Sequence, residues 1–234
     1  MRVAAFDVWG DYAHFRKIYT TTSPLTYSIP PRTALAGLVS AILGLRKDEY
    51  LEKMSKEKAS IGVGLVAHVK KTRLAENLID TKKAGGSMNA ITQRTQIRFE
   101  MLRNPRFRVY FSHEDPAIQT ALVGLLKEHK CVYTPCLGLS ELLADFSFVG
   151  EYDAGVTHPT DTVRLSSTIP EKQVEEIKFE KDYQYITETL PLDMAPDRTV
   201  LEYGSVLFER NAKPPLLRVK SCVQLSDGSM IAFL

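Results

Sequence analysis

The sequence has few of the features that mark a membrane or secreted protein. No apolar run in its 234 residues approaches the roughly 18 residues that span a membrane. Its three cysteines are an odd number and make no disulfide framework, which indicates a reducing compartment. Residues 1–7 include an acid and alternate like a strand, unlike a signal peptide. We therefore expect a cytoplasmic protein that does not associate with membranes.

Motifs for metals and nucleotides are also missing. Cys131 and Cys136 stand apart from any second cysteine pair, and a histidine such as His129 is more typical of a helix end than of a metal ligand. Gly62-Val-Gly64 resembles part of a dinucleotide fingerprint, but a predicted strand contains it and no helix follows. The sequence has no Gly-Lys-Ser phosphate loop. It therefore predicts no metal and no cofactor.

The net charge of +2 conceals two regions of opposite sign. Residues 66–110 contain ten basic and three acidic residues, a local net charge of +7. Residues 140–204 contain five basic and fourteen acidic residues, a local net charge of −9. Charge clusters are often only solvated surfaces, but two opposite poles favour a polyanion on one side and a basic protein partner on the other.

Residues 27–44 predict a rigid loop that leads into a buried helix. Pro30 and Pro31 fix φ and suit the end of a loop and the first turn of a helix. Apolar side chains then repeat at helical spacing, which predicts a core helix over about residues 32–45. A second stripe consists of small residues, namely Ala34, Gly37, Ala41 and Gly44. Because glycine costs a helix about 1 kcal/mol relative to alanine, we expect a packing role for Gly37, with another backbone close by.

The order of the predicted elements indicates an α+β fold. The elements are a strand at 2–9, the helix at 32–45, a short charged helix at 48–58, strands at 60–69 and 107–111, a helix after the cap Asp115, and a strand at 145–150. Strand-helix-strand, repeated once, is typical of a ferredoxin-like domain. The last part is β-rich, although residues 158–196 show no clear organisation. We expect a ferredoxin-like palm at 1–150 and a small β-rich subdomain at 151–234.

Residues 70–103 are the leading candidate for a functional surface. The stretch 70–94 has little apolar periodicity and a Lys-Lys-Ala-Gly-Gly-Ser tip at 82–87, which predicts an extended basic hairpin. Lysine and arginine along such a hairpin could follow phosphates, and arginine adds planar contacts to bases. The simpler interpretation is a solvated hairpin with no ligand.

Two motifs on either side of this hairpin resemble a known family. The first is residues 27–44, preceded by Phe15-Arg-Lys17, and the second is Tyr133-Thr-Pro-Cys-Leu-Gly-Leu-Ser-Glu141. With the basic region between them, they resemble the fifth CRISPR-associated (Cas) family over the first 150 residues. The last third matches more loosely, through Val206-Leu-Phe-Glu-Arg210 and the closing strands.

The resemblance implies a fold, a role and a set of partners. The fold is a ferredoxin-like (RRM/RAMP-like) palm with a basic β-hairpin thumb and a small C-terminal β-rich subdomain. The role is that of the subunit of a type I Cascade complex, nearest type I-B, that holds the 5′ handle of the CRISPR guide RNA in antiviral defence. The implied partners are the guide RNA, the Cascade backbone subunit beside the thumb, the large subunit, and a separate processing endonuclease.

The predicted RNA-binding residues fall in three places. Cations and a ring in the loop before the first helix lie near a helix N-terminus, which attracts phosphate, while bases stack on tyrosines. The basic hairpin is the second place, and the second motif, with a glycine that allows close backbone approach, is the third. The predicted set is Arg16, Lys17, Tyr27, Arg32, Lys70, Lys71, Arg94, Arg98, Arg103 and Gly138, with Tyr19, Arg73, Lys82 and Lys83 as further candidates.

Two other functions stay open. Relatives in type I-C complexes resemble metal-independent ribonucleases, which need a base, a cation and a tyrosine near the attacking 2′-hydroxyl. The adjacent Lys-His pair of those relatives is missing here, and His68 with Lys70 is the nearest substitute, beside Tyr19 or Tyr27. We therefore expect no enzyme activity and no catalytic residue. The third function is a protein-only assembly adaptor, docked through the acidic C-terminal part.

Overall fold

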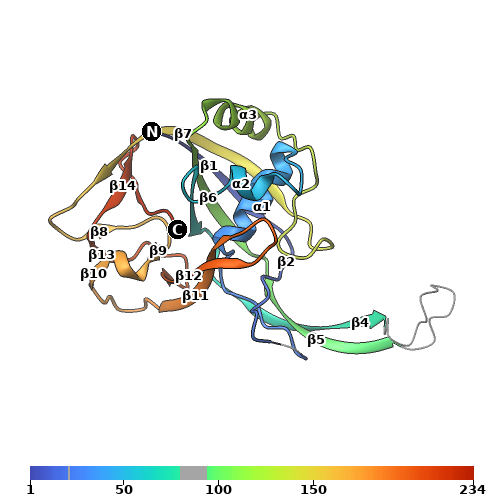
Figure 1. Ribbon diagram of the computed structural model, residues 1–234. Coiled ribbons are helices and arrows are strands. Elements are labelled where there is room, and N and C mark those ends of the chain that lie inside the picture. Colours follow the sequence, from blue (N-terminus) through green and yellow to red (C-terminus); the bar gives the residue numbers. More distant parts are fainter. Residues whose placement is uncertain (21, 80–93) are drawn as a thin grey trace.

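The computed structural model describes residues 1–20, 22–79 and 94–234 (Figure 1). Its centre is a six-stranded sheet with the order β15-β14-β7-β1-β6-β3, in which neighbouring strands are antiparallel. The strands are β1 (Arg2–Trp9), β3 (Ala59–Leu65), β6 (Arg106–His113), β7 (Asp145–Thr157), β14 (Cys222–Leu225) and β15 (Met230–Ile231).

Two helices connect strands of this sheet. Helix α1 (Arg32–Leu43) lies between β1 and β3 in sequence, and α3 (Pro116–Lys127) lies between β6 and β7, so the predicted strand-helix-strand order occurs twice. Both helices contribute to the core on one face of the sheet, around Phe6 and Val8 of β1. No helix in the described part of the chain is long and apolar enough to cross a membrane.

The helix ends follow from their capping residues. Asp115 caps α3, because its side chain accepts a hydrogen bond from the Ala117 backbone N–H at 2.8 Å. Gly44 ends α1 in the left-handed conformation, with φ of 76°. The charged helix predicted at 48–58 is shorter, since α2 covers only Tyr50–Lys53. Its Glu49–Lys53 ion pair is present at 3.0 Å.

The predicted basic hairpin is confirmed for its described residues. Strands β4 (Lys71–Ile79) and β5 (Arg94–Arg103) pair antiparallel from Lys71 opposite Leu102 to Ile79 opposite Arg94, and the short β2 (Tyr12–Ala13) pairs with the other edge of β5. We call β4 and β5 together the hairpin, and Figure 1 shows it projecting from the body of the molecule. The predicted tip at 82–87 lies outside the described residues.

The C-terminal part consists mainly of strands, both in residues 158–196, which the sequence left unorganised, and after residue 200, where the sequence predicted a β-rich part. Two three-stranded sheets form here, with the orders β10-β13-β8 and β11-β12-β9. Their elements are β8 (Val163–Arg164), β9 (Ile169–Pro170), the 3-10 turn Glu171–Gln173, β10 (Val174–Ile177), β11 (Tyr185–Met194), β12 (Val200–Glu209) and β13 (Leu216–Val219).

The expected division at residue 150 does not coincide with a break in the structure. Strand β7 runs through that position, and β14 extends the same sheet from the C-terminal part. The largest apolar core also combines Phe6 and Leu35 with Leu190 and Phe208. Residues before and after 150 therefore share one core, because the C-terminal strands supply apolar side chains that α1 needs for its burial.

Candidate nucleic-acid interface

Three arginines of the hairpin lie on one face. Residues that lie opposite each other in an antiparallel pair share a face, and the pairing of β4 with β5 is regular. Arg73, Arg94 and Arg98 are exposed and lie on the same face. Lys71 shares this face but is engaged at its base, where its Nζ donates to the Thr26 carbonyl at 2.8 Å and contacts Glu100 Oε1 at 3.1 Å. The predicted basic surface is therefore an arginine face.

The opposite face of the hairpin is mainly apolar, although it includes the exposed Glu76 opposite Ile97. Leu74, Ile97 and Phe99 alternate with the arginines, and Phe99 packs edge-on against the ring of His14 at 5.3 Å between centroids. Lys70 and Arg103 are exposed at the base of the hairpin, where the Arg103 backbone N–H donates to the Lys70 carbonyl. By strand alternation Arg103 lies on the face opposite Arg98, so the predicted arginines do not all contact the same ligand surface.

In the loop before α1, fewer of the predicted side chains are available to bind RNA than the sequence indicated. Arg16 is exposed and donates to the Thr20 carbonyl at 2.9 Å. Lys17 is half-buried and paired with Glu188 at 3.1 Å. Burial is the largest single influence and lowers the pKa of Lys17, but the hydrogen bond to Glu188, the charge of Glu188 and the contacts with Tyr19 together raise that pKa above its usual value. Tyr27 is 4% exposed under Lys17, so its ring is not available to stack on a base, whereas Tyr19 is 70% exposed.

The prediction that Arg32 contacts RNA is wrong. Its side chain is 1% exposed and donates to the carbonyls of Leu192 at 3.3 Å, Met54 at 2.9 Å and Ala59 at 2.7 Å. Asp193 lies 3.7 Å from the same guanidinium. Since a buried charge needs hydrogen bonds and a counter-charge, Arg32 serves the interior and is closed to ligands.

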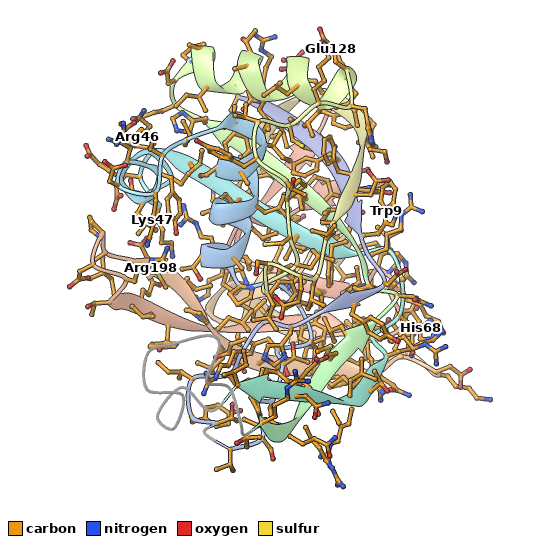
Figure 2. All side chains as sticks on the ribbon, turned by 90° about the vertical axis from the view of Figure 1, so that its right-hand side faces the viewer. Trp9, Arg46, Lys47, His68, Glu128 and Arg198 are labelled. Carbon is orange, nitrogen blue, oxygen red and sulfur yellow. The ribbon has the colours of Figure 1, made fainter. Side chains whose placement is uncertain are left out.

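A cleft runs along α1. It consists of two adjoining cavities of about 690 and 650 Å³ that share Thr33, Ala34, Tyr50, Gly138 and Arg198. We call this the helix cleft. Its cations come from three elements: Arg46 and Lys47 follow α1, Arg198 lies in the turn between β11 and β12, and Arg16 lies in the loop before α1. Figure 2 shows Arg46, Lys47 and Arg198 on the same side of the molecule, beside α1.

Tyrosines line the helix cleft between these cations. Tyr133 is 53% exposed, Tyr203 is 44% exposed, and Tyr50 is partly exposed, so each presents ring surface to solvent. Exposed rings between cations are the combination that binds single-stranded nucleic acid, because bases stack on rings while cations bind phosphates.

The small-residue stripe of α1 forms the floor of the helix cleft. A Cβ at Gly37 would meet no atom within 4 Å, so within the described part of the chain no backbone packs there as the sequence predicted. The close approach occurs at the end of the helix instead, where Tyr133 donates its N–H to the Ala41 carbonyl at 2.9 Å and Val132 packs on Gly44. Gly37 therefore leaves room for a molecule from outside the chain.

Gly138 has a structural reason to be glycine. It adopts φ of 101°, and a Cβ there would collide with the carbonyl of His14. The predicted close approach is thus to the chain's own backbone, although Gly138 also lines the helix cleft.

Sequence reasoning missed most of the residues that line the helix cleft. Arg46 and Lys47 follow a predicted helix, and Pro196-Asp197 marks a turn before Arg198, but nothing in these local patterns brings the three together. They meet because α1 packs against β11, which lies about 150 positions further along the chain. The periodicity of the sequence does not predict contacts between segments that lie so far apart along the chain.

Much of the acidic region at 140–204 is neutralised within the chain. Glu188, Asp193 and Glu202 pair with Lys17, Arg32 and Lys56 from the N-terminal part, at 3.1, 3.7 and 2.9 Å. Glu180 pairs with Arg164 and Glu176 with Arg218. The negative pole is therefore used largely for internal contacts.

The residues considered for metal or ribonuclease chemistry lie apart. His68 and Lys70 line a small cavity beside Ser28 and Arg103, whereas Tyr27 lines the helix cleft. Across residues 1–20, 22–79 and 94–234, no three His, Cys, Asp or Glu side chains gather as they would around a metal ion.

Comparison with known proteins identifies the family. The sequence matches the family described as CRISPR-associated protein (Cas_Cas5) over residues 4–209. The chain belongs to this family, as its two motifs indicated. The comparison with curated protein sequences gives no match.

Solved structures share the fold at low sequence identity. A crystal structure of a CRISPR protein from Archaeoglobus fulgidus has a TM-score of 0.59 and 14% identity, covering 98% of this chain and 97% of that one. A chain of a CRISPR RNA-guided surveillance complex gives 0.52 and 11%, covering 91% of each chain. A chain of the type III-B Cmr-beta complex bound to cognate target RNA and AMPPnP gives 0.53 and 12%, covering 93% of this chain and 86% of that one. The mostly β fold with few helices is thus shared with CRISPR proteins.

Proposed function

We propose that the chain is a non-catalytic guide-RNA-binding subunit of a type I Cascade complex that caps the 5′ handle. The observation that supports this most directly is the continuity of two RNA-suited surfaces. The arginine face of the hairpin meets the loop before α1 where Lys71 donates to the Thr26 carbonyl at 2.8 Å. The same loop supplies Arg16 to the helix cleft. A single strand could therefore run from the hairpin into the cleft.

The strand order supports a ferredoxin-like palm with a thumb. In the order β7-β1-β6-β3, the fourth strand of the double strand-helix-strand unit lies beside the first, followed by the third and the second. The hairpin is inserted between β3 and β6, at the turn that joins the two units. In this proposal the palm holds the handle and the hairpin is the thumb.

The two surfaces suggest where partners bind. The apolar face of the hairpin, with Leu74, Ile97 and Phe99, suits a protein neighbour, while the arginine face suits RNA. By membership of the family, we assign the neighbour on the hairpin to the Cascade backbone subunit. The large subunit and a processing endonuclease complete the proposed set of partners.

We propose that the chain does not cut RNA. General base catalysis needs the base within hydrogen-bond reach of the attacking hydroxyl, together with a cation at the phosphate. His68 lines the small cavity beside Ser28 and Arg103, whereas Tyr27 lines the helix cleft, so these two groups belong to different cavities. The separation of these groups supports a scaffold over a ribonuclease.

The test is binding and cleavage of repeat RNA by the purified full chain. End-labelled CRISPR repeat RNA is incubated in EDTA and resolved on native and denaturing gels at two salt concentrations. The proposal expects retained, intact RNA, with affinity that falls as salt rises. A discrete cut within the repeat contradicts the non-catalytic role. Interactions with other Cascade subunits that survive removal of the RNA by nuclease would favour the protein-only adaptor.

A pair of charge-reversal variants makes the test specific. Arg73→Glu with Arg98→Glu reverses the arginine face and should abolish retention of the RNA. Lys181→Glu with Lys220→Glu is the matched control, since these lysines are exposed on the C-terminal part and the change in charge is equal. Equal loss in both variants would show a general charge effect and would contradict the assignment of the hairpin.

A further inference from the structure

The central sheet has a second face that bears no helix. Because side chains alternate along strands, Asp7 and Trp9 of β1 and Arg106 and Arg108 of β6 point away from α1 and α3. Cross-strand pairing places Trp9 opposite Arg106 and Asp7 opposite Arg108. The C-terminal segment covers much of this face, through Val223 and through the backbone that packs on Gly62 and Gly64 of β3, but Arg106 and Arg108 stay partly exposed. We call the four residues of β1 and β6 the sheet-face cluster.

A buried carboxylate fixes two arginines on this face. Asp7 is 3% exposed and accepts hydrogen bonds from Arg106 Nη2 at 3.0 Å, Arg108 Nε at 2.8 Å and Arg108 Nη2 at 3.3 Å. These bonds raise the pKa of Arg108. The two arginine side chains nevertheless keep 46% and 36% of their surface exposed. Asp7 cancels one of the two arginine charges, and the neighbouring Asp145, opposite Trp9 on β7, contacts His129 at 3.1 Å. The two arginines therefore form a fixed cationic pair beside Trp9.

An aromatic ring completes the sheet-face cluster. The guanidinium of Arg106 lies over the indole of Trp9, with 4.9 Å from its Cζ to the ring centroid. In the described part of the chain, only one terminal nitrogen of Arg106 donates to Asp7, which leaves further N–H groups for another acceptor. A flat guanidinium on an indole is a platform for a nucleobase, and its remaining donors suit a phosphate.

We infer that the sheet-face cluster is a second binding site for single-stranded nucleic acid. An acidic protein would use only the charges, whereas a nucleic-acid strand uses both the charges and the guanidinium stacked on the Trp9 ring. The arginines also continue the basic surface of the hairpin base, since a turn at Asn104-Pro105 is all that separates Arg103 from Arg106. A strand that follows the hairpin base reaches this face directly.

This site is separate from the helix cleft. In Figure 2, Trp9 lies on the opposite side of the molecule from Arg46, Lys47 and Arg198. The proposed function concerns the cleft and the arginine face of the hairpin, and the sheet-face cluster goes beyond it. The two proposals can therefore fail independently.

Trp9 is the single tryptophan of the chain, so its fluorescence reports this site without a label. The full chain is titrated with a dye-labelled 12-nucleotide oligouridylate while dye anisotropy and tryptophan emission are recorded together. The inference expects the oligonucleotide to quench Trp9 emission with the same midpoint as the anisotropy change. Polyglutamate of similar charge should leave the emission unchanged.

Two variants and one control identify the residues. Arg106→Gln should lower the slope of log affinity against log salt by about 1, because one phosphate contact is lost. Arg106→Lys should retain the slope but reduce the quenching, since an ammonium does not stack flat. Arg2→Gln removes the same charge from the other face of β1 and should change neither quantity. Arg108 still holds Asp7 in both Arg106 variants, so the fold is preserved.

Each other result overturns the inference in a distinct way. An anisotropy change without quenching would mean that the oligonucleotide binds only elsewhere, which leaves the proposed function intact. Equal quenching by polyglutamate would mean an acid-binding surface instead. No anisotropy change at all would contradict this inference, whereas the proposed function is decided separately by the gel assay with CRISPR repeat RNA.

Discussion

Arg32 is a buried cation with a structural role. Its guanidinium joins three separate segments, at Met54, Ala59 and Leu192, through their carbonyl oxygens. Loss of the donor to a buried carbonyl costs about 1–3 kcal/mol per group. The side chain thereby connects the start of α1 to both halves of the chain.

Replacing Arg32 should therefore destabilise the fold and leave the RNA contacts alone. Arg32→Ala is expected to lower the free energy of unfolding by about 3–5 kcal/mol, because Asp193 and three carbonyls lose their partner. Urea unfolding followed by circular dichroism measures this. Arg46→Ala, at an exposed arginine, should change stability by no more than about 0.5 kcal/mol. Equal stability of the two variants would contradict the structural role of Arg32.

The buried Tyr110 should make the free energy of unfolding depend on pH in the alkaline range. Burial raises the pKa of its phenol from 10.0 to about 12, so between these values the folded chain holds a proton that the unfolded chain has lost. The neutral phenol stabilises the folded state fully below pH 10. The free energy of unfolding then falls by up to about 2–3 kcal/mol as the pH rises towards 12. Tyr110→Phe should unfold with a flatter profile between pH 9 and 11 in denaturant titrations at each pH. Identical slopes for both proteins would contradict this cause.

At the scale of elements, α1 combines a buried face with an open one. Leu35, Val39 and Ile42 are buried in the core, whereas Ala34 and Gly37 form the floor of the helix cleft. A helix with so little side chain on one face leaves room for a ligand and loses propensity at the glycine. Gly37 thus lowers the stability of the helix and at the same time keeps the cleft open.

Two substitutions at Gly37 separate helix stability from cleft volume. Gly37→Ala should raise the free energy of unfolding by about 1 kcal/mol, since its Cβ meets no atom within 4 Å, and should leave RNA affinity nearly unchanged. Gly37→Leu should fold equally well but weaken handle binding by about tenfold, equivalent to ~1.4 kcal/mol. Thermal unfolding and gel retention measure the two effects. Full affinity in Gly37→Leu would place the RNA outside the cleft.

The elements could be predicted from the sequence where the pattern is local. Alternation predicted β1 and β6, Asp115 marked the start of α3, and the basic stretch predicted the hairpin. The helix cleft could not be predicted, because it exists only where the turn at Arg198 meets α1. Nor could the burial of Arg32, since arginine at a helix start beside prolines is usually a surface residue.

At the scale of the whole molecule, the two halves depend on each other for their core. Leu190, Leu192, Val206 and Phe208 belong to the same apolar cluster as β1 and α1. Burial of one such side chain contributes about 1.5–3 kcal/mol, so four of them match much of the roughly 5–15 kcal/mol that stabilises a typical domain.

The fragment 1–150 is accordingly expected not to fold. It would lack these four side chains and would end within β7. Far-UV circular dichroism and limited proteolysis of the fragment check this, with the full chain as control, which should unfold in a single cooperative transition. A fragment that unfolds cooperatively would restore the division into an independent palm and a separate subdomain.

The ion pairs between the halves have a consequence for the chain while it is being made. Lys17, Arg32 and Lys56 are synthesised long before Glu188, Asp193 and Glu202, which neutralise them in the folded protein. Residues 1–139 contain 21 basic and 12 acidic residues, so until the acidic region at 140–204 leaves the ribosome the nascent chain carries a net charge of +9, with its basic residues accessible beside ribosomal RNA and mRNA. Completion of the acidic region then withdraws part of this charge from competing nucleic acids, so slower translation should lengthen the period in which the unfinished chain binds RNA unspecifically.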